Sequence, residues 1–478
     1  MFEFTSIEQY HAQLKEGKVT CAEVVEYFLK RIKACEHLNA FIEVFADEAL
    51  AKASLIDAKL KKGESLGKMF GVITGIKDVI CYKDHKISAA SGILQNFTSL
   101  YSATAVERLL DEDAIIIGRL NCDEFAMGSS NENSYYGKVL NAKDETRVPG
   151  GSSGGSAVAV QAGLCMISLG SDTGGSVRQP ADFCGIVGLK PTYGRISRYG
   201  LIAYASSFDQ IGIFGINVPD VTLALEVMAG PDDFDSTVSH SPVPAYSSLV
   251  DTNEKFRFAF FEEAITHPGL DPEIRSSIER KIKELKEDGH TVEPVEFDLL
   301  EYLVPAYYIL TTAEASSNLS RYDGVKFGYR SPNATNDLDD FYKKTRSEGF
   351  GWEVKRRIML GTFVLSTGYY DAYFTKAQSV RKILTEKISL IFKDFDFVIL
   401  PTSPVPAFKL GEKMSDPIAM YLADIYTVMA NLTGCPAISI PLFAHSNELP
   451  FGLQLMSNRF NEVSLLRISD DLLRKNTP

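Results

Sequence analysis

The sequence lacks the features of a membrane-bound or secreted protein. No stretch approaches the roughly eighteen consecutive apolar residues that span a bilayer. The first six residues carry no basic segment followed by an apolar run, as a secretory signal would. The seven cysteines are odd in number and form no Cys-x-x-Cys pair, which argues against a disulfide framework and against a zinc site. We therefore expect a soluble, cytoplasmic protein with reduced cysteines and no membrane association.

Positive charge and nucleotide-binding motifs are also scarce. The 49 Lys and Arg residues against 62 Asp and Glu residues leave a formal net charge of -13. Because nucleic-acid phosphates are bound by clustered Lys and Arg, we do not expect this chain to be a principal nucleic-acid binder. No Walker A, H-E-x-x-H or G-x-G-x-x-G pattern occurs. Nucleotide-driven and metal-driven chemistry are therefore disfavoured, and we expect no cofactor or metal in this chain.

The order of the predicted elements indicates an α/β fold in a single large domain, residues 1–478. Residues 1–63 are predicted to form an N-terminal helical segment, because Ser6 to Gln9 and Thr20 to Glu23 have the form of capping boxes. Strands are predicted in 72–80, 114–118, 164–169, 256–261, 291–295, 397–401, 437–441 and 451–455, and helices in 47–62, 104–111, 156–162, 271–288 and 462–474, with further helices between 299 and 391. This order predicts a mixed β-sheet core flanked by helices.

Two Gly/Ser-rich loops lie close together in the chain. They read Val148-Pro149-Gly150-Gly151-Ser152-Ser153-Gly154-Gly155-Ser156 and Gly170-Ser171-Asp172-Thr173-Gly174-Gly175-Ser176-Val177-Arg178-Gln179-Pro180. Such loops can bring hydroxyls and free backbone N–H groups into one small volume, where acyl transfer needs a nucleophile, a proton carrier and an oxyanion hole. A flexible linker is the alternative, but the apolar segments between the loops resemble core.

A lysine lies in the middle of a β-branched run. Lys77 lies in the predicted strand 72–80, which is otherwise mostly apolar. Lysines are rarely buried unless they are paired or functional, and burial lowers the pKa of the amine so that it can act as a base. The alternatives are an edge-strand lysine that faces water and an ion-pair partner for Asp78.

Histidine offers a competing base for a serine nucleophile. The run from Gly151 to Gly155 also fits the G-x-S-x-G nucleophile elbow, but polar and charged residues precede it where an elbow needs a strand. Most of the seven histidines lie in charged or loop-like surroundings, and His85 is the nearest candidate. With histidine set aside, Lys77 is the natural base.

These residues resemble the amidase signature family. The resemblance includes Gly75-Ile76-Lys77-Asp78 and both Gly/Ser-rich loops, in order and spacing, and it marks residues 71–212 as the catalytic core. It implies that Ser176 is the acyl nucleophile, that Ser152 is a bridging serine held by a cis peptide bond, and that Lys77 is the base. The oxyanion hole would be formed by the backbone N–H groups of Thr173, Gly174, Gly175 and Ser176.

The C-terminal half resembles one branch of this family, the glutaminase (A) subunits of tRNA-dependent amidotransferases. The segments that carry this resemblance are 314–324, 346–351, 355–363 and 369–373. It implies that glutamine is the substrate and that 299–391 is a helical substrate-pocket region. The α-carboxylate and α-ammonium of glutamine require a cation and an anion. The matching positions hold Arg357 and Asp424, with Tyr308 and Ser129 as further substrate-binding candidates, and Arg356 and Tyr307 remain alternatives to Arg357 and Tyr308.

The same resemblance implies partners. A B subunit would bind ATP, Mg²⁺ and the misacylated tRNA, and a small C subunit would embrace the glutaminase subunit. Ammonia would pass through a channel to the γ-phosphorylated glutamate on tRNA, which converts Glu-tRNA(Gln) to Gln-tRNA(Gln), and a shared glutaminase subunit would also serve Asp-tRNA(Asn). The alternatives are a free-standing amidase that acts on another carboxamide, and a catalytically inactive scaffold.

Overall fold

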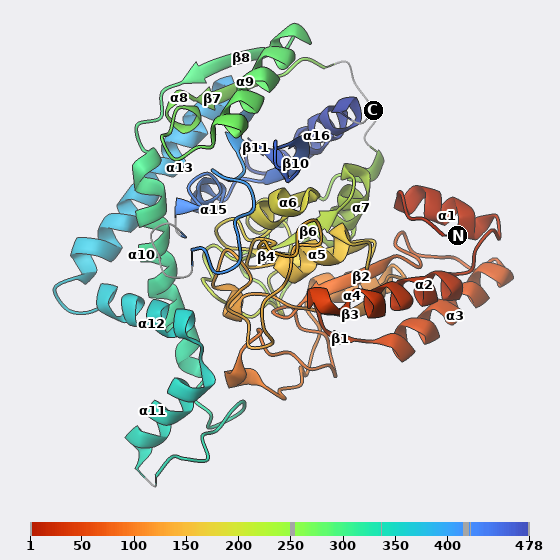
Figure 1. Ribbon diagram of the computed structural model, residues 1–478, viewed down its shortest axis with the longest axis horizontal. Helices are drawn as coiled ribbons and strands as arrows, with labels where there is room; N and C mark the ends of the chain where they lie inside the picture. Colours follow the sequence, from red (N-terminus) through yellow and green to blue (C-terminus); the bar gives the residue numbers. More distant parts are fainter. Residues whose placement is uncertain (1, 249–253, 336, 414–419, 421, 477–478) are drawn as a thin grey trace.

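A mixed β-sheet forms the core of the protein (Figure 1). The computed structural model describes residues 2–248, 254–335, 337–413, 420 and 422–476. The strands are β1 Phe41–Val44, β2 Ile73–Lys77, β3 Ile115–Leu120, β4 Ile167–Asp172, β5 Val187–Lys190, β6 Gln210–Gly215, β7 Arg257–Phe261, β8 Thr291–Val295, β9 Phe397–Pro401, β10 Ala437–Ala444 and β11 Pro450–Ser457. Their order in the eleven-stranded sheet is β1-β3-β2-β4-β6-β5-β10-β11-β9-β7-β8.

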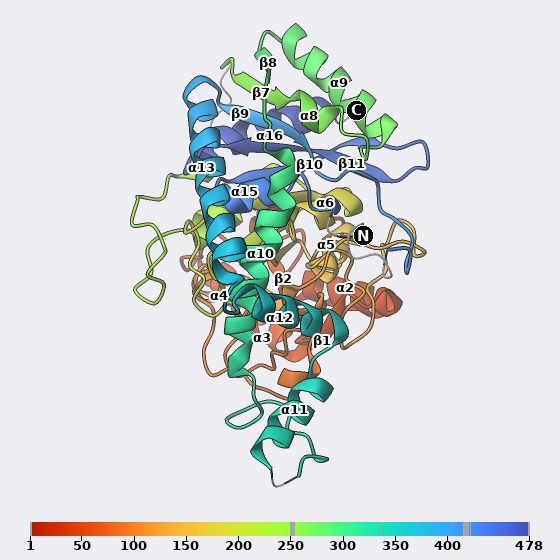
Figure 2. The same ribbon diagram turned by 90° about the vertical axis from the view of Figure 1, so that its left-hand side faces the viewer.

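Helices surround this sheet, and some of them lie at the two ends of the molecule (Figures 1 and 2). They are α1 Ile7–Lys15, α2 Cys21–Ala34, α3 Ala46–Lys62, α4 Thr104–Asp111, α5 Gly154–Gln161, α6 Arg178–Cys184, α7 Val218–Met228, α8 Glu262–Ile265, α9 Pro272–Glu287, α10 Leu300–Asn318, α11 Leu338–Gly349, α12 Trp352–Val364, α13 Lys376–Asp394, α15 Val428–Thr433 and α16 Glu462–Asn476. Helices α8 and α9 lie with β7 and β8 at one end of the molecule, and α11 lies at the other (Figures 1 and 2). No helix in the described ranges is both long and apolar enough to cross a membrane.

The predicted fold class is confirmed, because the sheet is mixed and helices flank it. Strand β2 pairs in parallel with β3 and β4, whereas β4 pairs antiparallel with β6. Every residue of β2, β3 and β4 is buried, as expected for strands covered on both faces.

The capping signals predicted the first helices well. Thr20 caps α2 with both hydrogen bonds of a capping box, and α3 ends at Gly63, whose φ of 69° is left-handed. The prediction of helices alone in 1–63 is wrong at one place, since β1 lies between α2 and α3. This strand has only four residues and pairs with the distant strand β3, so its own sequence carries little periodic signal.

Candidate active site

The site lies where β2 and β4 end side by side. Lys77 is the last residue of β2, Asp172 is the last residue of β4, and the two strands are parallel neighbours. Their carboxyl ends therefore open at the same edge of the sheet, which is where ligands bind in open α/β sheets. One Gly/Ser-rich loop leads into α5 and the other follows β4. The two loops meet here, since Ser153 Oγ of the first donates to the Ser171 carbonyl at 3.2 Å.

The Lys77 ammonium is surrounded by three serine hydroxyls. Its Nζ donates hydrogen bonds to the Oγ atoms of Ser152 at 2.7 Å, Ser153 at 2.9 Å and Ser171 at 2.9 Å. Lys77 is fully buried, and burial lowers the pKa of its amine to about 8, although nearby carboxylates oppose the shift. A neutral lysine is therefore accessible near physiological pH. Ser153 and Ser171 were not among the predicted site residues.

Both alternatives for Lys77 are wrong. Its strand, β2, lies between β3 and β4 and is not an edge strand. The Asp78 carboxylate instead forms an ion pair with Arg119, with 2.6 Å between Nη1 and Oδ1. Because Asp78 is paired with Arg119, the Lys77 amine forms its hydrogen bonds with the serine hydroxyls instead.

Ser152 lies in a tightly held turn. The Gly151–Ser152 peptide bond is cis, as the family resemblance implied. The Gly151 N–H donates to Gln179 Oε1 at 3.0 Å, and the Asp123 N–H donates to the Ser152 carbonyl at 3.0 Å. A side chain at Gly151 would overlap the Asp123 carboxylate, so glycine is required here.

Ser176 is the most exposed of the three predicted catalytic residues. It is 9% exposed, whereas Lys77 and Ser152 are fully buried. Within the described residues, hydrogen bonds join Lys77 to Ser152 but none joins Ser152 to Ser176. The structure thus brings Lys77 and Ser152 into contact, and the roles of Lys77, Ser152 and Ser176 stay predictions.

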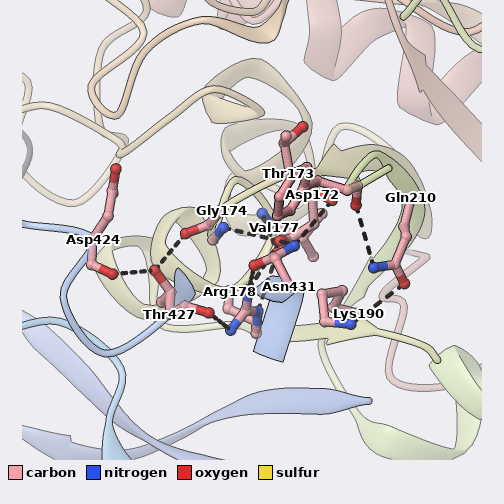
Figure 3. A network of polar contacts seen from close by, with 12 residues as sticks. Asp172, Thr173, Gly174, Val177, Arg178, Lys190, Gln210, Asp424, Thr427 and Asn431 are labelled. Atoms are coloured by element: carbon pink, nitrogen blue, oxygen red, sulfur yellow. Dashed lines mark hydrogen bonds and ion pairs between the residues drawn. The ribbon is translucent and has the colours of Figure 1, made fainter. Parts of the chain in front are cut away.

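The loop around Ser176 is braced by Asp172 (Figure 3). The carboxylate of Asp172 accepts the Gly175 N–H at 2.9 Å and the Val177 N–H at 3.1 Å. In the part of the chain that the structure describes, the N–H groups of Thr173, Gly174 and Ser176 have no intramolecular acceptor. These three donors are therefore available for an oxyanion, whereas the Gly175 N–H, which was also predicted, is engaged by Asp172.

Asp172 is held in its charged form by Arg178. Burial alone would raise the pKa of Asp172, but the charge and hydrogen bonds of Arg178 outweigh it and lower this pKa to about 2. The guanidinium meets the two carboxylate oxygens at 2.9 and 3.1 Å, and Asn431 donates to the same carboxylate at 2.9 Å. These contacts were not predicted from the sequence. Asp172 and Arg178, two opposite charges in a loop between apolar segments, could have indicated an ion pair.

The candidate for binding the glutamine ammonium lies next to this loop. The Asp424 carboxylate accepts hydrogen bonds from Ser129 Oγ at 3.0 Å and from Tyr308 Oη at 2.7 Å. Burial raises the pKa of Asp424 to about 6, although these two hydrogen bonds oppose the shift. The structure thus joins three of the four predicted substrate-binding residues, since Ser129 and Tyr308 both donate to Asp424.

Arg357 completes the group from α12. Its side chain is 4% exposed, whereas that of Arg356 is 29% exposed. The Arg357 guanidinium donates to Tyr204 Oη at 2.8 Å and lies 5.4 Å from the centre of the Tyr308 ring. Because it is the more deeply buried of the pair and lies beside Tyr308, Arg357 is the better placed arginine.

Tyr307 and Tyr308 face different parts of the site. The Tyr308 hydroxyl reaches Asp424, whereas the Tyr307 ring packs so closely that a side chain at Gly174 would overlap it. The geometry therefore favours Tyr308 as the substrate-side residue and gives Tyr307 a packing contact with the loop.

Comparisons with known proteins agree with this geometry. The family model described as Amidase matches residues 23–466. This chain belongs to the amidase family. It is 51% identical to the A subunit of glutamyl-tRNA(Gln) amidotransferase from Chlorobium luteolum, over 99% of this chain and 97% of the relative, and 48% identical to its counterpart of the same name from Koribacter versatilis, over 97% of each chain. The crystal structure of the Thermotoga maritima protein with this name is similar with a TM-score of 0.78 and 39% identity, over 96% of this chain and 95% of the other.

His85 does not take part in this amidase site. Its ring stacks on Tyr82 with 3.9 Å between centroids, and its Nε2 lies 3.0 Å from Glu48 Oε2 on α3. A histidine base at this position therefore has no geometric support. Among the described residues, no cluster of three or more His, Cys, Asp or Glu side chains could hold a metal ion.

Proposed function

We propose that this amidase is the glutamine-hydrolysing component, the A subunit, of a tRNA-dependent amidotransferase and that the residues described above perform the hydrolysis. The observation that supports the proposal most strongly is that the predicted substrate-binding residues around Asp424 lie next to the loop that carries Ser176. Thr427, three residues after Asp424, donates to the carbonyl of Gly174 in the nucleophile loop at 2.6 Å. A buried carboxylate and a buried guanidinium thus lie beside the acyl-transfer residues, as an amino-acid amide substrate requires.

The proposed first step is acylation. Asp424, with Ser129 and Tyr308, holds the α-ammonium of glutamine, and Arg357 holds its α-carboxylate. Ser176 Oγ attacks the side-chain amide carbon, and its proton passes to Ser152 while Ser152 passes its own proton to neutral Lys77. The oxyanion accepts hydrogen bonds from the N–H groups of Thr173, Gly174 and Ser176, and each such donor can contribute a few kcal/mol.

The attack of Ser176 gives a tetrahedral intermediate. When this intermediate collapses, the proton taken up by Lys77 is passed to the leaving group. Lys77 gives its proton back through Ser152 to the leaving nitrogen, so the C–N bond breaks, ammonia leaves and a γ-glutamyl ester remains on Ser176. Water then attacks the ester with Lys77 and Ser152 as the base, which releases glutamate and restores Ser176. In this scheme Lys77, Ser152 and Ser176 carry all of the protons, so the proposal assigns no cofactor to this chain.

The names of the relatives support a role in a larger complex. We expect the B subunit to bind ATP, Mg²⁺ and misacylated tRNA, and the C subunit to embrace this chain. The net charge of -13 fits this division, because tRNA contact requires positive charge. A cytoplasmic location follows from this role.

The test is turnover with and without partners. The chain should be purified alone and together with the B and C subunits, and glutamine hydrolysis should be measured with and without Glu-tRNA(Gln) and ATP. We expect weak hydrolysis by the chain alone and faster hydrolysis in the loaded complex. Turnover of aryl or lipid amides with no turnover of glutamine would contradict the proposal and favour a free-standing amidase, and no turnover of any amide would favour an inactive scaffold.

A further inference from the structure

The peptide between Gly174 and Gly175 is held at both of its polar groups (Figure 3). Its carbonyl accepts a hydrogen bond from Thr427 Oγ1 at 2.6 Å, and its N–H donates to Asp172 Oδ1 at 2.9 Å. Thr427 and Asp172 are fully buried. The plane of this peptide is therefore held from two sides by buried side chains.

The orientation of the Gly174–Gly175 peptide affects the N–H groups on either side of it. The Gly174 N–H belongs to the preceding peptide and the Ser176 N–H to the following one. Neither has an intramolecular acceptor within the described ranges. Because neighbouring peptide planes share a Cα atom, the direction of each free N–H depends on the plane between them.

The loop packs closely against its neighbours at Gly174 and Gly175. Gly175 has a φ of 131°, in the region that favours glycine, and a side chain there would overlap Thr427. A side chain at Gly174 would overlap Tyr307 on α10. Thr427 therefore contacts the loop in two ways, by its hydrogen bond to the Gly174 carbonyl and by close packing against Gly175.

Thr427 is also part of the turn that presents Asp424. The Thr427 N–H donates to the Asp424 carbonyl at 3.1 Å, and the Thr427 carbonyl accepts from Arg178 Nη1 at 2.7 Å. Its hydroxyl lies 3.1 Å from the Asp424 carbonyl, but a hydroxyl has one proton and the Gly174 carbonyl is closer. One residue thus joins the Asp424 turn to the nucleophile loop.

We infer that Thr427 is a positioning residue for the oxyanion hole, and that its hydroxyl aligns the donors of the loop with the turn that carries Asp424. The inference rests on the proposed function, because it assumes that Ser176 attacks an amide within this loop. Thr427 itself does not touch the reacting atoms. Losing its hydroxyl should therefore slow the chemical step and leave the binding of substrate nearly unchanged.

The test compares three substitutions in the complex of the chain with its partners. Thr427→Val removes the hydroxyl and keeps the shape, whereas Thr427→Ser keeps the hydroxyl. Thr433→Val is the matched control, because Thr433 is a buried threonine in the adjoining helix α15 whose hydroxyl donates to Met429 O at 2.8 Å. For Thr427→Val we expect kcat for glutamine to fall about tenfold or more with KM within about twofold, since small misalignments are costly in catalysis. Thr427→Ser and Thr433→Val should stay close to the unsubstituted protein.

Three results would overturn the inference. They are a kcat for folded Thr427→Val within twofold of the unsubstituted protein, an equal loss in Thr427→Ser, and a rise in KM with kcat unchanged. Thermal unfolding of each variant shows that it is folded. If the unsubstituted protein hydrolyses another amide but not glutamine, the proposed function fails, and the same kcat comparison on that amide still tests the role of Thr427.

Discussion

Lys77 shows how a single residue obtains its chemistry from its position. It ends an interior strand of the sheet, so its amine is removed from water and contacts three serine hydroxyls. Burial lowers the pKa of this amine to about 8, from an ordinary value near 10.5. The neutral form is then present in useful amounts near neutral pH, as a general base requires.

The pH dependence of kcat/KM follows from this pKa. The base acts in its neutral form, so activity should be low below pH 7, rise through about pH 8 and level off above it. Lys77→Ala should lose acylation while it keeps its fold, as measured by thermal unfolding, because a smaller apolar side chain replaces the buried amine. A flat profile between pH 6 and 9, or unchanged rates in Lys77→Ala, would contradict this role of Lys77.

At the scale of elements, the substrate side of the site depends on the packing of α12 against α10. Helix α10 supplies Tyr308 and α12 supplies Arg357, while Asp424 comes from the turn before α15. The outer face of α12 is exposed, with Met359 at 72%, and its inner face is buried. The position of Arg357 therefore depends on how closely α12 packs on α10.

Gly361 makes that close packing possible. A side chain there would overlap the Thr312 carbonyl of α10. We expect Gly361→Val to lower the stability of the protein by about 1–3 kcal/mol, as overpacking does, and to raise KM for glutamine by moving Arg357. Met359→Val on the exposed face of the same helix is the control and should change neither. Unchanged melting temperature and KM in Gly361→Val would contradict the packing argument.

At the scale of the whole molecule, local signals in the sequence predicted much of the fold. Helix α4 and strand β9 have the predicted bounds, and the capping residue Thr20 marked the start of α2. The strands β1, β5 and β6 were missed. They have four to six residues, and β5 and β6 contain glycines. All three strands form only by pairing with strands that are distant in the sequence, which no local pattern records.

The same limit applies to the site. The contact between Lys77 and Ser152 was predicted, because both residues lie in motifs that resemble those of a known family. The support from Asn431 to Asp172 joins residues 259 positions apart, and the hydrogen bond from Thr427 joins residues 253 positions apart. Only the fold brings such pairs together, so the sequence suggested candidates for the reacting groups but not the residues that hold them in place.

The central claim is that Ser176 forms a glutamyl ester with the help of Lys77 and Ser152. The most direct measurement is mass spectrometry of the chain, in complex with its partners, after acid quenching during glutamine turnover or after labelling with the γ-hydroxamate of glutamate. The account predicts a γ-glutamyl group on the peptide that contains Ser176, and none in Ser176→Ala. Glutamine consumption with no adduct on Ser176, or with an adduct on another residue, would contradict it.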